Sequence, residues 1–402
     1  IVLDAVIRFS LSQRVMVLLF GFAVCGLGYR AFVGLPIDAF PDVSTPQVKI
    51  VIKAPGMTPG EVEQRITIPI ELEILGIPKQ TMLRSVAKYA LTDITLDFEP
   101  GTDIYWARQQ VAERLNNVWP ELPEDASGGI APMTTPLGEM FMFTIDSDSV
   151  SLMERRRLLD WVIRPALRGV PGVADVNALG GFVRSYEVTP DPARLARFDV
   201  SMADLVRAIR GNNRNDGAGR VTIGEEAMLV RSEGRIGTLE DLGRIVVALR
   251  DGMPIEVRDV ADVRIGALTR YGAVSESGRH ETVQGLVLGL RGANAREVVA
   301  GVRARLDELA PALPDEVDIR VFYDRGDLVA RAVGTVEKAL TEATVLVLLL
   351  LLAFLGSPWP ALAVAAVLPL SALATFAIMR EAQMSANLMR DRKSTRLNSS
   401  HY

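Results

Sequence analysis

The sequence is nearly free of the two residue types that most often bind transition metals. Among 402 residues there is one cysteine, Cys25, and there are two histidines, His280 and His401. A single cysteine cannot form a disulfide within the chain, and zinc sites built on Cys and His need more of both. We therefore expect any metal ligands to be carboxylates or thioethers.

Catalytic and cofactor motifs are also missing. The sequence contains no Gly-x-Ser-x-Gly, no His-Glu-x-x-His, and no cysteine outside the apolar run that holds Cys25. The run GNNRNDGAGR, residues 211–220, lacks the Gly-Lys-Ser/Thr ending of a phosphate-binding loop. These absences predict that the chain is not an enzyme and binds no cofactor or nucleotide.

Excess positive charge is absent, whereas apolar residues are abundant. The formal net charge is -5, which argues against a nucleic-acid partner. Hydrophobic residues make up 49% of the chain, and the mean hydropathy is +0.22. The apolar excess lies at the two ends, so we expect a membrane protein with a large soluble middle.

Three apolar runs predict membrane helices. Residues 15–32 are long enough to span a bilayer, and Gly-Leu-Pro follows them where a cleaved signal peptide would have small residues. Residues 327–357 and 358–380 predict two further spans separated by SPWP, with Pro369 tolerated inside the later one. Residues 343–379 carry no ionisable side chain, so these spans cannot relay protons.

The middle of the chain has the pattern of two related α/β units. The first has a strand at 48–54, a helix at 59–75, a hairpin over 81–99 and a helix at 103–119, the order of a split βαβ unit. The second has a strand at 138–146 and helices at 151–170 and 295–309. The end of the first unit, RLNNVWPELPED, resembles that of the second, RLDELAPALPDE. We therefore expect an α+β protein with two ferredoxin-like units in tandem.

An insertion at residues 185–266 interrupts the second unit. It contains a predicted helix at 201–210, the Gly/Asn-rich run 211–220, and strand-like runs at 244–249 and 253–260. The insertion is long enough to form a small domain of its own. The Gly/Asn-rich run is predicted to form the tip of a hairpin.

Two carboxylates, Asp38 and Asp42, lie in the stretch GLPIDAFPDVSTPQV between the first span and the first strand. They could bind a divalent cation together, or they could be turn and cap residues of a connector. Three prolines prevent a continuous helix here, and two carboxylates supply too few oxygens for a calcium site. The connector is the favoured interpretation.

Three methionines offer thioether ligands. Met140 and Met142 are expected to share one face of a strand, and Met133 lies just before that strand. Thioethers bind soft ions such as monovalent copper, so these side chains could relay a metal. Methionine that fills a hydrophobic core is the commoner case.

Several stretches together resemble the N-terminal half of a permease of the resistance-nodulation-division (RND) superfamily, in its heavy-metal efflux branch. They are LPIDAFPDVSTPQV, APGMTPGEVEQRIT, GTDIYWARQQVAERL, GVADVNALGG, VRDVADVRIG and YDRGDLVARA. The resemblance implies a proton-driven homotrimer in the bacterial inner membrane, with a metal cation as substrate. It also implies a periplasmic adaptor and an outer-membrane channel as partners, besides the membrane lipid.

The resemblance also implies a division of the chain. The predicted parts are an N-terminal helix and first span (1–34), a first porter subdomain (35–131), a second porter subdomain (132–184 and 267–326), a docking insertion (185–266), a second span (327–357), a third span (358–380) and the start of a fourth (381–390). Arg8 and Arg14 precede the first span and predict a cytoplasmic N-terminus, which places residues 35–326 in the periplasm. The docking loop that reaches a neighbouring protomer would comprise Asn212, Asn213, Arg214, Asn215 and Asp216.

Two alternatives to metal export stay open at this point. One is an exporter of hydrophobic compounds, and the other is a membrane-anchored periplasmic binding or assembly module. In the family the proton carriers of the fourth span and the main metal ligands would follow residue 389, so the chain alone is expected not to transport. Residues 391–402 resemble a translated sequencing adapter, with a basic cytoplasmic tail as the alternative.

Overall fold

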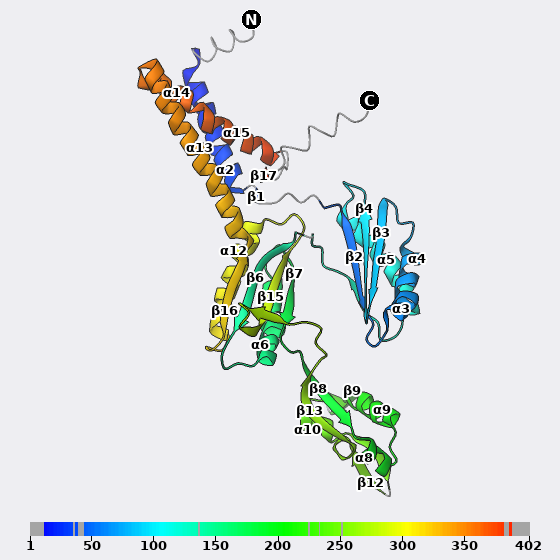
Figure 1. Ribbon diagram of the computed structural model, residues 1–402. Coiled ribbons are helices and arrows are strands. Elements are labelled where there is room, and N and C mark those ends of the chain that lie inside the picture. The colour runs from blue at the N-terminus through cyan, green and yellow to red at the C-terminus, as the bar shows by residue number, and fades with distance from the viewer. Residues whose placement is uncertain are drawn as a thin grey trace.

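The computed structural model describes residues 12–34, 37–38, 44–135, 137–223, 226–232, 234–250, 252–381 and 386–387. It is a mixed α+β structure with helices at one end, two sheets that each carry helices, and the insertion at the opposite end (Figure 1). The apolar runs of the sequence form the helical end. The predicted class of fold is confirmed at this level.

Among the described residues the helical end contains α2 (Arg14–Gly34), α13 (Arg325–Leu355), α14 (Pro358–Ala365) and α15 (Val367–Glu381). Helix α2 packs against α15, where the rings of Phe32 and Phe376 lie 5.1 Å apart. Gly28 permits this close approach, since a Cβ there would lie 2.6 Å from the Cβ of Leu373. A small residue at the contact is a common device where membrane helices pack.

In the part of the chain that the structure describes, two helical segments are long and apolar enough to cross a membrane, Val15–Phe32 and Pro358–Glu381. They correspond to the first and third spans expected from the sequence. The second span, expected at 327–357, lies in α13, whose charged N-terminal part precedes an apolar C-terminal part. That span stays a prediction.

The structure adds two local details to the last membrane segments. The run that contains Pro369 is divided at Ala366 into α14 and α15, because proline lacks an N–H and its ring crowds the carbonyl four residues earlier. Within the expected fourth span, 381–390, the described residues Ala386 and Asn387 are extended and pair with Ile37 and Asp38. These two residues form strand β17, and the start of a fourth span at 381–390 stays a prediction.

The first α/β unit is a four-stranded antiparallel sheet of order β3-β4-β2-β5. Alternate side chains of β2 and β4 are buried against the helices, as a half-covered sheet requires. Asp103 caps α5 by accepting a hydrogen bond from the Tyr105 amide at 2.9 Å. The elements are β2 (Gln47–Lys53), α3 (Pro59–Val62), η1 (Glu63–Thr67), α4 (Ile68–Ile74), β3 (Gln80–Lys88), β4 (Leu91–Phe98), α5 (Ile104–Val118), η2 (Trp119–Glu121) and β5 (Ser127–Ile130).

The second unit repeats this topology with the order β7-β15-β6-β16. The short strand β14 pairs with the first residues of β15. Its core contains Phe141, Phe143 and Ile145 of β6, packed under the helices. The elements are β6 (Glu139–Asp146), α6 (Leu152–Leu158), η3 (Leu159–Ile163), α7 (Arg164–Arg168), β7 (Val173–Gly180), β14 (Val274–Glu276), β15 (His280–Gly289), α12 (Ala295–Leu309), η4 (Ala310–Ala312) and β16 (Asp318–Asp324).

The helices at 59–75 and 151–170, expected to be continuous, each contain a π-helical turn, η1 and η3 respectively. A proline follows each turn, Pro69 in the first unit and Pro165 in the second. Proline cannot donate to the carbonyl four residues back, so a wider turn absorbs the missing bond. This shared feature supports the interpretation that the two units are an internal repeat, which the similar sequences at their ends also suggest.

The insertion folds around its own small core, which includes Leu205, Leu242 and Val257. Antiparallel strands β8 (Arg184–Pro190) and β13 (Ala261–Ala267) form its two connections to the second unit (Figure 1). Between them lie α8 (Pro192–Arg197), α9 (Met202–Asn212), β9 (Asp216–Ile223), β10 (Glu226–Ser232), α10 (Leu239–Gly243), β11 (Val246–Arg250), β12 (Met253–Glu256) and α11 (Val257–Val260).

Two local predictions for the insertion are wrong. The strand-like run 253–260 ends as a strand at Glu256 and continues as the short helix α11. The run 211–220 is not a hairpin tip, because Asn212 ends α9 and Asp216 begins β9. Strand β9 pairs with β10 from Ile223 and Glu226 outward, so the two strands are joined after Ile223, beyond the run 211–220. A turn was predicted there because β9 contains glycines, which are common in turns.

Candidate functional site

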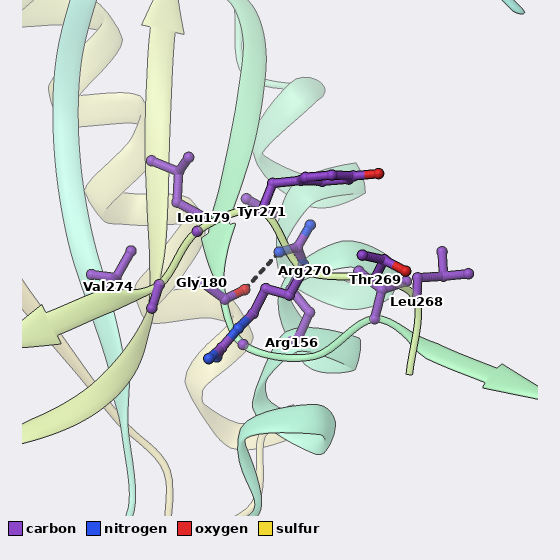
Figure 2. A pocket seen from close by; sticks show the side chains of 13 residues that line it. Arg156, Leu179, Gly180, Leu268, Thr269, Arg270, Tyr271 and Val274 are labelled. Atoms are coloured by element: carbon purple, nitrogen blue, oxygen red, sulfur yellow. Dashed lines mark hydrogen bonds between the residues drawn. The ribbon is translucent and has the colours of Figure 1, made fainter. Parts of the chain in front are cut away.

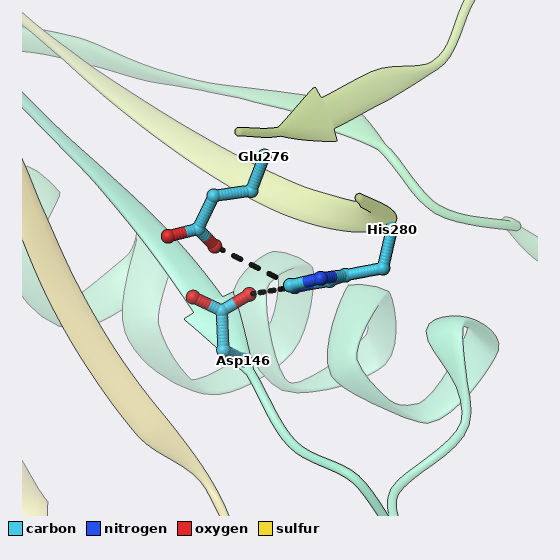
Figure 3. Close-up of side chains that lie close together, drawn as sticks. All are labelled: Asp146, Glu276 and His280. Carbon is cyan, nitrogen blue, oxygen red and sulfur yellow. Dashed lines mark ion pairs between the residues drawn. The ribbon is translucent and has the colours of Figure 1, made fainter. Parts of the chain in front are cut away.

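The second unit brings together three side chains that can bind a metal: Asp146, Glu276 and His280 (Figure 3). Asp146 ends β6, Glu276 ends β14, and His280 begins β15. Ser277 and Gly278 turn the chain between β14 and β15 with φ values of 52° and 66°, so that Glu276 and His280 are paired across the hairpin. Strand β15 is also antiparallel to β6, which brings Asp146 alongside.

The donor atoms of this Asp-Glu-His cluster lie close to one another. His280 Nε2 is 3.8 Å from Asp146 Oδ1 and 3.7 Å from Glu276 Oε2. All three possible ligand atoms lie within 4.8 Å of one another. The two carboxylates are largely buried, whereas the imidazole is 54% exposed.

Neighbouring groups hold both carboxylates in place. Thr282 donates to Asp146 Oδ1 at 2.6 Å, and Thr144 donates to Asp146 Oδ2 at 2.8 Å. Arg320 of β16 donates to Glu276 Oε1 at 2.5 Å. The other oxygen, Glu276 Oε2, is buried and has no hydrogen-bond partner among the described residues.

The electrostatics of the cluster keep Asp146 ionised. Burial acts to raise the pKa of Asp146, but contacts with Thr282, Glu276 and Thr144 and the charge of Arg320 outweigh it and lower that pKa. At neutral pH the cluster therefore presents an anionic oxygen beside an imidazole. Oxygen and imidazole nitrogen donors in this number suit zinc, cobalt and nickel.

This cluster was not predicted from the sequence, because two histidines in the whole chain led us to expect only carboxylates and thioethers as ligands. The fold places two carboxylates beside the single imidazole of His280. The spacing of Glu276 and His280 across a short Ser-Gly turn was the available signal. Asp146 lies far away in the sequence, and only the pairing of β6 with β15 places it nearby.

The methionines do not form a shared thioether site. A β-bulge between Val287 and Leu288 of β15 leaves Met140 opposite no partner and turns its side chain into the core. Met140 is buried there, whereas Met142 is half-buried outside that core cluster. The expectation that they share one face is wrong, because the bulge shifts the alternation by one residue. Met133 lies before the strand, where its carbonyl accepts from the Arg291 amide.

The other predicted candidates are placed only in part. Asp38 lies in the short strand β1 (Ile37–Asp38), and Asp42 lies outside the described residues. Asn213 and Asn215 both serve the insertion itself: their side-chain oxygens accept from the amides of Ile236 and Arg235. The predicted docking role of residues 212–216 stays a prediction. Residues 391–402 lie outside the described residues.

A pocket of about 300 Å³ lies where the chain leaves β7 for the insertion and returns to β14 (Figure 2). Arg156 donates to the carbonyl of Gly180 at 2.7 Å in its wall, and Tyr271 is 80% exposed. The guanidinium of Arg270 lies 4.4 Å from the ring centre of Phe182. The charged groups that line the pocket are cations, so it does not suit a metal ion.

The helical end, the repeated α/β units and the donor cluster define an α+β protein with two candidate membrane spans and a group of side chains that can bind a metal. Comparison with known proteins gives the family: residues 6–390 match the AcrB/AcrD/AcrF family, and the chain belongs to it. This is an RND transporter family and not an enzyme family, in agreement with the sequence analysis.

Curated relatives share 32–42% identity with the chain. It is 42% identical over 394 residues to protein HelA of Legionella pneumophila, and 40% identical over 395 residues to the cobalt-zinc-cadmium resistance protein CzcA of Cupriavidus metallidurans. It is 34% identical over 390 residues to the cation efflux system protein CusA of Escherichia coli. Each alignment covers 96% of this chain and 37% of the relative.

Solved structures give the same result. The fold is similar to two crystal forms of a heavy metal efflux pump, with TM-scores of 0.86 and 0.87 at 36% identity. These alignments cover 94% and 95% of this chain and 38% of the pump. The chain thus spans well under half the length of the proteins that it resembles.

Proposed function

We propose that the chain is the N-terminal part of a proton-driven permease that exports heavy-metal cations from the periplasm or cytoplasm. The observation that carries this proposal is the alignment of nearly the whole chain with cation-resistance proteins and with a heavy metal efflux pump. The working pump would be a homotrimer in the inner membrane, joined to a periplasmic adaptor and an outer-membrane channel.

The proposed parts follow the described units. The first and second α/β units would be periplasmic porter subdomains, and the insertion would dock against a neighbouring protomer. Their shared strand order supports a ferredoxin-like assignment for both porter subdomains. Helices α2, α13, α14 and α15 would contact lipid, with α13 as the additional span.

The chain alone would not transport, because it covers about 37% of its relatives. Its function is therefore best tested in a chimera, in which residues 6–390 replace the matching segment of the Cupriavidus CzcA protein. The chimera should restore growth of a metal-sensitive host on Zn²⁺ or Co²⁺. The control is a matched chimera that lacks residues 185–266. It should be expressed but should not assemble into a pump, and therefore should not restore growth.

The same cells separate metal export from export of hydrophobic compounds. Cells with the chimera should accumulate as much ethidium as cells with an empty vector. A chimera that lowers ethidium accumulation and gives no metal resistance would overturn the proposal in favour of drug export.

A further inference from the structure

The Asp-Glu-His cluster lies in the second unit, where neither the family assignment nor the sequence pattern placed a ligand. We propose that Asp146, Glu276 and His280 bind one divalent cation with a preference for zinc, cobalt or nickel. That the ion is cargo rests on the proposed function; that it binds here rests on the geometry of the three side chains.

The spacing of the three donors fits an ion better than direct contact between them. His280 Nε2 lies 3.8 Å from Asp146 Oδ1 and 3.7 Å from Glu276 Oε2, beyond ordinary hydrogen-bond distance. Two ligands of a tetrahedral zinc ion with bonds near 2.0–2.1 Å lie about 3.3 Å apart. The two distances from His280 thus exceed this separation by only a few tenths of an ångström.

The buried oxygen Glu276 Oε2 is available to bind a cation. It has no hydrogen-bond partner among the described residues, although buried carboxylate oxygens are normally paired. Arg320 holds the opposite oxygen, which aims Oε2 toward His280. Threonine hydroxyls orient Asp146 in the same way. Such outer contacts typically fix the ligands of a metal site.

The donor set also limits which ion binds. Two carboxylates and one imidazole suit borderline divalent ions, whereas monovalent copper and silver prefer thiolates and thioethers. Met140 and Met142 do not supply that soft alternative, because the bulge directs Met140 into the core. The site therefore favours the zinc, cobalt and nickel group as cargo.

Three protein ligands leave room for exchange. Structural zinc sites usually have four protein ligands, whereas sites with three keep one position for water or another ligand. His280 is half exposed, so one side of the cluster is open to solvent. An open position is suited to an ion that must bind and leave.

The competing interpretation is an ion-pair cluster, in which protonated His280 bridges the two carboxylates without metal. The charged groups that face it are Asp146 of β6, Glu276 of β14 and Arg320 of β16, with Asp318 next to Arg320. In that case removal of His280 would change local charge but not metal binding.

The test is a cobalt titration of the 402-residue chain, purified without metal in detergent. A His401→Gln background leaves His280 as the single imidazole, because the sequence has two histidines. Visible absorption bands then report Co²⁺ with nitrogen and oxygen ligands. The variants are His280→Gln and Glu276→Gln, and the control is Asp148→Asn, which removes an exposed charge two residues from Asp146.

The parent and the Asp148→Asn control should each bind one Co²⁺ per chain, and Zn²⁺ should displace it. The His280→Gln and Glu276→Gln variants should bind at least about tenfold more weakly. Far-ultraviolet circular dichroism confirms that each variant is folded. Equal cobalt binding in the parent and both variants, or a parent that binds none, would overturn the site.

The same substitutions in the chimera distinguish failure of the site from failure of the proposed function. If the parent chimera confers zinc resistance while the chain binds no cobalt at this cluster, the site is wrong and the function stands. If the chain binds cobalt as predicted but no chimera confers resistance, the site stands and the cargo assignment is wrong.

Discussion

Arg291 and Ser44 join the second α/β unit to the connector that enters the first. The Arg291 guanidinium donates to the carbonyl of Ser44 at 2.7 Å and to that of Thr45 at 3.2 Å. Strand β2 begins two residues later, at Gln47. The side chain of Arg291, which follows β15 in the second unit, therefore fixes the backbone just before the first strand of the first unit.

Replacing this arginine should loosen the connector without unfolding either sheet. Arg291→Ala removes charge-assisted hydrogen bonds, each worth roughly 1.5–3 kcal/mol when well formed. Amide hydrogen exchange should rise several-fold at residues 44–48 and stay unchanged in β4 and β6. Arg296→Ala, at an exposed position of α12, is the matched control. Equal exchange at the connector in both variants would contradict the link.

The contact of α2 with α15 depends on Gly28. Gly28→Ala should destabilise the helical end by about 1–3 kcal/mol, because the new Cβ would overlap Leu373. Gly21→Ala is the control, since its Cβ meets no atom within 4 Å, and alanine favours a helix. Thermal unfolding in detergent measures both. A Gly28→Ala melting temperature at or above that of Gly21→Ala would refute the packing.

A pair of buried hydroxyls stabilises the first unit. Thr67 Oγ1 donates to Thr92 Oγ1 at 2.8 Å between η1 and β4. Thr92→Val should cost about 1–3 kcal/mol, since it leaves a buried hydroxyl without this partner. Thr67→Val, Thr92→Val together should cost less than the sum of the single changes. Denaturant unfolding of the parent and the three variants supplies the cycle, and strict additivity would argue against the bond.

Acid should weaken the cap of α8 in the insertion. Hydrogen bonds from the amides of Arg194 and Ala193 and from the Arg194 side chain lower the pKa of Asp191. A lowered folded pKa means that the stabilisation is present above the unfolded pKa of about 3.9 and is lost as pH falls through the folded value.

The matched variant for this prediction is Asp191→Asn, which keeps a capping side chain but does not titrate. The parent should lose more stability than Asp191→Asn between pH 5 and pH 2.5, as measured by urea unfolding of the insertion followed by hydrogen exchange. The same loss in both proteins would show that Asp191 is not the group responsible.

Much of the fold followed from local pattern. The alternating strands of the first unit, the cap at Asp103 and the long apolar runs are all local signals, and the structure has them where expected. The misplaced hairpin tip arose because the glycines of β9 suggest a turn, although β10 pairs with it. Local propensity is overridden there by strand pairing.

The candidate site could not be predicted in the same way. Asp146 and His280 lie on strands that are neighbours only after the insertion has been looped out, so their proximity is a property of topology. The methionine prediction failed for a related reason, since one extra residue in the bulge at Met140 reverses which side chains face the core. Neither the pairing of β6 with β15 nor the bulge can be recognised from the hydrophobic periodicity of a single strand.

The most direct test of the account is proton flux through proteoliposomes that contain the chimera of residues 6–390 with the remainder of CzcA. With a pH-sensitive dye inside, Zn²⁺ or Co²⁺ added on the side of the two α/β units should stimulate proton movement, and ethidium should not. Proton flux that responds to ethidium and ignores both metals would contradict the assignment of this chain to a heavy-metal exporter.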